Sequence, residues 1–209
     1  MEHRFERYCG ISLITATVLM VITMILHPAG GSMEHLLKIS SIIIISHSIA
    51  LVSLPFGLLG FWGLTKHLDN AGILPMGAFI TMSLGMVAVM CAAAANGLIL
   101  PMFINHYKDA PPEIINSINP ILKYNSALNH AFDYIYMGAS CIAVFTWSVL
   151  ILQTGRLPKW LGWLGIVLAL VLIVSAIIGF VFTDLTGFRI FILGFVVWTI
   201  CAGLLLMKK

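Results

Sequence analysis

The sequence predicts an all-helical (all-α) polytopic membrane protein, a bundle of six transmembrane helices with both termini in the cytoplasm. Of its 209 residues, 60% are hydrophobic and only 9% are charged, and the mean hydropathy is +1.05. A soluble domain carries about 25% charged residues. Apolar segments of about 20 residues, the length that crosses a bilayer, also recur along the chain. We place six spans in a single transmembrane domain, 1–209, near 8–27, 40–64, 72–101, 122–152, 160–182 and 188–206.

The same composition excludes several classes of protein. The net charge of +3 is small and no basic run exceeds two residues, which argues against nucleic-acid binding. The four cysteines lie in apolar segments without Cys-x-x-Cys spacing, a pattern typical of neither a disulfide framework nor a zinc knuckle. The apolar run that ends at Leu26 is too long for the core of a signal peptide, and no small-x-small cleavage site follows it. We expect a retained first span.

The distribution of lysine and arginine predicts the orientation. With the N-terminus inside, seven basic residues fall on the cytoplasmic side and four outside. We therefore expect a multi-pass protein of the cell inner (cytoplasmic) membrane of a bacterial type of cell, with the lipid bilayer as its partner. The inner set is Arg4, Arg7, Lys66, Arg156, Lys159, Lys208 and Lys209, and the outer set is Lys38, Lys108, Lys123 and Arg189.

The second helix is expected to begin outside the hydrocarbon. Ser32 is a plausible N-cap, so the helix would begin near Met33 and enter the bilayer at Ser40. Pro55 and a series of glycines in its lower half suit a kink and close helix packing. That series is Gly57, Gly60 and Gly63.

The third and fourth spans carry buried polar groups. Asn96, near the outer end of the third span, needs a hydrogen-bond partner. The outer segment 103–118 is longer than a usual helix connection, and we expect it to be a lid over anything bound beneath it. Asn119 followed by Pro120 predicts the start of the fourth helix.

Tryptophans and prolines mark the start of the fifth span. The stretch 156–165 reads Arg-Leu-Pro-Lys-Trp-Leu-Gly-Trp-Leu-Gly, where Trp160 and Trp163 are expected interfacial anchors. Together with His27-Pro-Ala-Gly-Gly and Ser46-His47, this stretch resembles uncharacterised bacterial multi-span membrane proteins. The resemblance implies a helical membrane fold and brings no established activity and no catalytic residue.

The last span carries a row of aromatic residues along one helical face, which predicts packing or lipid contact. The row comprises Phe188, Phe191, Phe195 and Trp198.

Three histidines on different spans reach a similar height. His27 lies roughly 28 Å above the cytoplasmic edge, His47 roughly 28 Å and His130 roughly 33 Å, counted at 1.5 Å per residue. Asp133 lies on the same helical face as His130, one turn below. Ionisable groups at membrane depth are costly, which makes this cluster a candidate site that opens towards the outer face.

Two kinds of bound group fit these side chains. A b-type haem would be held by His47 and His130, with Arg189 near the propionates, and would serve electron transfer to or from quinone. A transition metal ion (Zn, Fe or Cu) would be held by His27, His47, His130 and Asp133, and could assist hydrolysis or act on a small apolar substrate.

Two alternatives stay open. A transporter of a small molecule or ion would use Pro55 and Pro101 as helix breaks, with Asn96 and Asp133 as an ion-linked pair. In a structural membrane protein without a cofactor, the same histidines would form hydrogen bonds with other groups of the protein.

Overall fold

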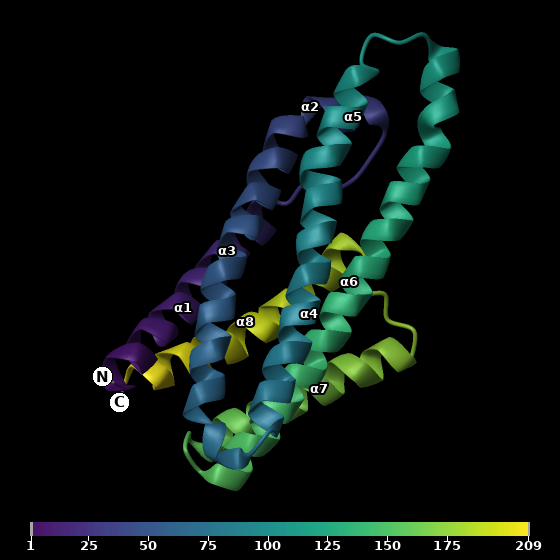
Figure 1. The fold of residues 1–209 in the computed structure, drawn as a ribbon. Helices are drawn as coiled ribbons and strands as arrows, with labels where there is room; N and C mark the ends of the chain where they lie inside the picture. Colours follow the sequence, from purple (N-terminus) through teal and green to yellow (C-terminus); the bar gives the residue numbers. More distant parts are fainter. Residues whose placement is uncertain (1, 209) are drawn as a thin grey trace.

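The computed structural model describes residues 2–208, and within that range it is helical with no strand. The last of the predicted cytoplasmic basic residues, Lys209, lies outside the described residues. A 3-10 turn (Asp69–Ala71) and a π-helical turn (Ala95–Ile99) separate some of the helices. The α-helices, labelled in Figure 1, are α1 (Glu2–Leu26), α2 (Met33–Lys38), α3 (Ser40–His67), α4 (Leu74–Ala94), α5 (Leu100–His106), α6 (Pro112–Thr154), α7 (Lys159–Ile177) and α8 (Leu185–Met207).

Within residues 2–208, six helices are long and apolar enough to cross a membrane, which indicates a multi-pass membrane protein. The third of them is one rod, Leu74–His106, that joins α4, the π-helical turn and α5. The fifth predicted span was too long at its end, because α7 stops at Ile177 and Gly179 then takes a left-handed φ of 91°. A residue without Cβ adopts that conformation at little cost, so the chain turns there.

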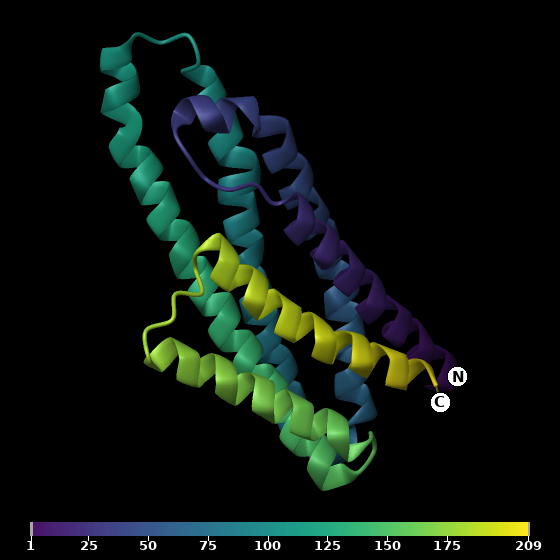
Figure 2. The ribbon, with the colours of Figure 1, turned by 180° about the vertical axis from the view of Figure 1, so that it is seen from behind.

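The helices form one elongated bundle in which the two ends of the chain lie together. α1 packs between α3 and α8, and α6 packs against α4 and α7. The first and last described residues lie at the same end of the bundle, here called the termini end (Figure 1). At the opposite or distal end, the α4–α5 rod and α6 extend past α7 and α8 (Figure 2). The distal end is therefore built mainly from α1, α2, α3, α5 and α6.

Aromatic side chains fill the core nearer the termini end. The ring of Trp147 on α6 stacks on Phe61 of α3 at 5.1 Å and on Trp198 of α8 at 6.3 Å between centroids. Phe61 also contacts Phe195, which stacks on Phe191 one turn away. All five rings are buried. The aromatic stripe of the last span is thus a packing face, as predicted, and it ties α8 to α3 and α6.

Glycines let α3 approach its neighbours closely. A Cβ on Gly60 would overlap Leu13 of α1, and a Cβ on Gly63 would overlap Cys9. Gly57 faces the end of Met86 on α4 in the same way. Small residues at helix contacts allow backbones to pack tightly in an apolar solvent. The prediction of close packing along this glycine series is confirmed.

The segments around α2 and α6 give one confirmed prediction and two wrong ones. Ser32 is the N-cap of α2, since its Oγ accepts a hydrogen bond from the backbone N–H of His35 at 3.3 Å, and α3 begins at Ser40. The expected lid over 103–118 is wrong, because α5 and α6 leave only residues 107–111 outside a helix. α6 starts at Pro112 rather than after Asn119, because proline at the first helical position needs no N–H partner.

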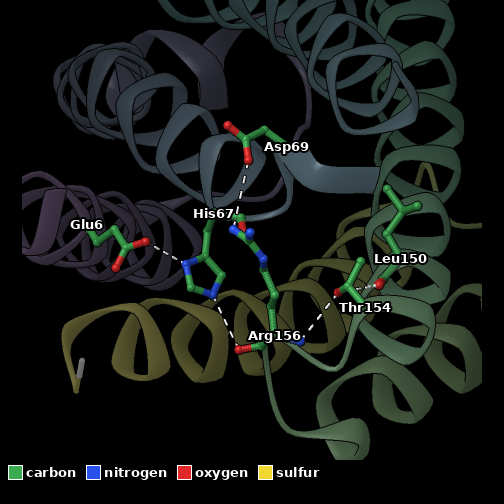
Figure 3. Close-up of polar contacts among 6 residues, drawn as sticks. All are labelled: Glu6, His67, Asp69, Leu150, Thr154 and Arg156. Carbon is green, nitrogen blue, oxygen red and sulfur yellow. Dashed lines mark hydrogen bonds and ion pairs between the residues drawn. The ribbon is translucent and has the colours of Figure 1, made fainter. Parts of the chain in front are cut away.

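A polar cluster closes the termini end (Figure 3). Nδ1 of the buried His67 lies 2.6 Å from Oε1 of Glu6 on α1, and its Nε2 lies 3.4 Å from the backbone oxygen of Arg156. The Arg156 guanidinium donates to the backbone oxygen of His67 at 2.9 Å and lies 3.8 Å from Asp69. These contacts join α1, the end of α3 and the α6–α7 connection. His67 thus belongs to a structural cluster far from the distal end.

A histidine-lined candidate binding cavity

A cavity with a volume of about 420 Å³ lies at the distal end. Its walls come from the end of α1 and the loop after it, from α3, from α4 with its π-helical turn, from α6 and from the start of α8. Apolar side chains make up much of the wall, and polar ones gather on facing helices. The polar set is Thr23, His27, His47, Asn96, Asn125, Ser126, Asn129, His130, Asp133, Thr183 and Asp184.

Two of the predicted histidines contact each other. The rings of His27 and His47 lie 4.9 Å apart between centroids, at an angle of 51°. Nδ1 of His47 lies 2.8 Å from the backbone oxygen of Ile43, and Nδ1 of His27 lies 3.1 Å from that of Pro28. A carbonyl oxygen only accepts, so each Nδ1 carries a proton. In the neutral ring, Nε2 is then left as an acceptor.

The position of His47 depends on a glycine in the π-helical turn. Gly97 packs directly against this side chain, and a Cβ there would overlap the Cβ and the ring of His47. The extra residue of a π-helical turn is frequent at functional sites, because it shifts the register of the side chains that follow. Here it brings the backbone of the α4–α5 rod against the imidazole.

Burial keeps the loop histidine uncharged. The pKa of His27 is lowered to about 4, mainly by burial and also by the proximity of His47 and of Arg189. The Arg189 guanidinium donates to the backbone oxygen of His27 at 3.1 Å, which fixes the loop after α1 on the start of α8. Arg189 therefore positions the loop and is not among the residues that line the cavity.

On α6, polar side chains line the cavity at intervals of one turn. The amide nitrogen of Asn129 donates to Oδ2 of Asp133 at 2.8 Å, and Asp133 is only 7% exposed. One turn further, the amide nitrogen of Asn125 donates to Oδ1 of Asn96. The partner expected for Asn96 is thus an amide of α6. Sequence reasoning missed Asn125, although its spacing of four and eight residues before Asn129 and Asp133 puts the three on one helical face.

The four predicted metal ligands line the same cavity, but they do not gather into a ligand set. Within the described range 2–208, no group of three or more His, Cys, Asp or Glu side chains is arranged to hold a metal ion. His130 lines the cavity with an exposed side chain, whereas His47 is 7% exposed. Asp184 also lines it, and its Oδ1 caps α8 at the backbone N–H of Gly187.

No family model, curated protein or solved structure matches this chain. The cavity at the distal end, hereafter called the chamber, combines hydrogen-bond acceptors and a buried carboxylate.

A second, apolar cavity of about 70 Å³ lies next to the first, towards the middle of the bundle. Ala50 and Ala93 are among the residues that line both cavities, so they lie at the shared boundary, here called the junction. Deeper in, the walls are formed by side chains such as Met82 and Phe195 from the aromatic core. The distal cavity thus has both polar and apolar walls, whereas the pocket nearer the core is almost wholly apolar.

Proposed function

We propose that the protein is a multi-pass protein of a bacterial type of inner membrane, with both termini in the cytoplasm, that binds an amphipathic small molecule in its distal cavity. Six apolar helices support the membrane location. The excess of lysine and arginine near the termini end supports the orientation, because basic loops stay in the cytoplasm.

One observation carries the proposal: the distal cavity, which is lined by several polar groups, lies next to an apolar pocket, and Ala50 and Ala93 line both. The volume of about 420 Å³ lies within the range of roughly 300–1,000 Å³ that small-molecule sites occupy. A molecule with one polar end and an apolar chain would place its polar end in the chamber and its chain in the apolar pocket. Its chain would be removed from water, which contributes about 0.8 kcal/mol for each buried CH₂.

The depth of the chamber suits such a molecule. Asp133 precedes Thr154, the last residue of α6, by a rise of roughly 32 Å at 1.5 Å per residue. The hydrocarbon layer is about 30 Å thick. Polar groups of the chamber would lie near the outer edge of the hydrocarbon, and the apolar pocket within it. An amphipathic molecule in the surrounding membrane has its own polar group at a comparable depth.

The test is to obstruct the junction. Ala50→Phe places a ring between the two cavities, whereas Ala131→Phe adds the same ring at an exposed position on α6 that lines neither cavity. We expect the purified wild type and Ala131→Phe to bind 1-octanol in calorimetry, and Ala50→Phe to bind it at least about tenfold more weakly, a loss of about 1.4 kcal/mol. Equal binding by all three proteins would contradict the proposal.

A transition-metal site at His27 and His47 is the second candidate. It is favoured by the two Nδ1 contacts to backbone oxygens, an arrangement that orients the Nε2 of ligating histidines in metal proteins. Haem held by His47 and His130 has less support, because the ring of His47 is in contact with His27. Elemental analysis and an oxidised-minus-reduced visible spectrum of the purified protein test both. Stoichiometric metal that is lost in His47→Ala would support the metal site, and a reducible Soret band would support haem.

A further inference from the structure

The two histidines in the chamber present acceptors. Since Nδ1 of His27 and of His47 each donates to a backbone oxygen, the Nε2 lone pair of each neutral ring is left for a ligand. No carboxylate within residues 2–208 bonds to either of these two rings, so neither has the counter-charge that a buried imidazolium needs. A ligand that offers hydrogen-bond donors therefore matches them, and one that offers only acceptors does not.

Within residues 2–208, the buried carboxylate of Asp133 on α6 has no positively charged partner. Asp133 is 7% exposed, and its hydrogen bond comes from the neutral amide of Asn129. Removing an unpaired charge from water costs several kcal/mol, so an ionisable group at membrane depth normally has a partner. A bound cation would supply that partner.

The charged groups around the cavity also favour a cationic ligand. Its lining includes the carboxylates of Asp133 and Asp184 and no lysine or arginine. The Arg189 guanidinium lies outside the lining and donates to the backbone oxygen of His27. Lys38 and Lys123 are exposed at the distal end and are not part of the lining. An anionic ligand would meet carboxylates and lone pairs, whereas a cation would meet complementary groups.

We infer that the ligand of this cavity is an amphipathic cation: an ammonium group lies in the chamber lined by His27, His47 and Asp133, and its apolar chain extends into the pocket below. This inference rests on the proposed function and narrows it to one class of ligand. An ammonium group has donors and no acceptor, so it suits both the carboxylate and the Nε2 atoms. Charge-assisted hydrogen bonds are also about twice as strong as neutral ones.

The test compares three probes that share one chain, n-octylamine, 1-octanol and octanoate, by calorimetry on the full-length protein at pH 7.5. We expect the wild type to bind n-octylamine about tenfold or more tightly than 1-octanol, and octanoate more weakly than either. The Asp133→Asn variant should lose the preference for n-octylamine and should still bind 1-octanol. Asp109→Asn removes an exposed carboxylate outside the cavity and should keep the preference.

The outcomes separate the two proposals. If the wild type binds 1-octanol as tightly as n-octylamine, or prefers octanoate, the cation inference is overturned and the binding function stands. If Asp133→Asn keeps the preference, the inference is also overturned. If none of the three probes binds to the wild type, both proposals are overturned. Because retained 1-octanol binding reports a folded cavity, loss of the amine preference in Asp133→Asn cannot be attributed to unfolding.

Discussion

Gly97 offers the sharpest test of how the cavity wall is built. The π-helical turn presses this residue against His47, so a methyl group at Gly97 must displace the imidazole or the rod. Overpacking of this kind costs about 1–3 kcal/mol. The change in helix propensity acts in the opposite direction, because replacing glycine by alanine within a helix stabilises the protein by about 0.5–1 kcal/mol. Gly97→Ala should therefore be destabilising or close to neutral, and it should weaken n-octylamine binding because His47 moves.

A matched control separates the overlap with His47 from the change in helix propensity. Gly77 lies in the same rod, and a Cβ there meets nothing within 4 Å. Gly77→Ala carries the same change in backbone propensity without the overlap, so the two variants should differ in unfolding free energy by about 1–3 kcal/mol. The assay is denaturant unfolding in detergent, followed by circular dichroism. Equal unfolding free energies for the two variants, with unchanged binding, would refute the close approach of Gly97 to His47.

Two further predictions concern charge. First, the pKa of His27 is lowered from 6.5 to about 4, so the unfolded chain takes up a proton below pH 6.5 that the folded protein accepts only near pH 4. The contribution of His27 to stability should be constant above pH 6.5 and fall by up to about 1.4 kcal/mol per pH unit towards pH 4. In thermal unfolding scans His27→Gln should lack this contribution, and a pH profile identical to that of the wild type would contradict it. Second, Glu6→Gln should destabilise by about 1–3 kcal/mol because it removes the carboxylate from buried His67. Glu34→Gln, in the exposed pair with Lys38, should change nothing measurable, and equal effects would contradict a structural role for the termini-end cluster.

Composition and local signals predicted the helical class and several details of it. The apolar runs could be counted from the sequence because a span needs about 20 apolar residues. The Ser32 cap and the glycine contacts of α3 also followed from local rules, since a cap needs one side-chain oxygen and a close helix crossing needs small residues. Local signals failed at α6, where two prolines were each able to start the helix and the earlier one, Pro112, does so.

The candidate site could be predicted only in part. Depth along separate helices brought His27, His47, His130 and Asp133 to one end of the bundle, and all four line the cavity. Depth does not determine rotation about a helix axis, so the exposure of His130 was not foreseen. The π-helical turn could not be foreseen either, because an asparagine and a glycine, Asn96 and Gly97, do not by themselves distinguish a π-helical turn from an α-helix. That turn changes which side chains face the cavity.

The position of a bound chain tests the central claim most directly. Crystals of the protein grown with 8-bromo-1-octanol can be measured at the bromine absorption edge, where the anomalous signal locates the end of the chain. The account predicts a bromine peak in the apolar pocket below Ala50 and Ala93, with the hydroxyl in the chamber above. Bromine peaks confined to the outer, lipid-facing surface of the bundle, with the pocket empty, would contradict it.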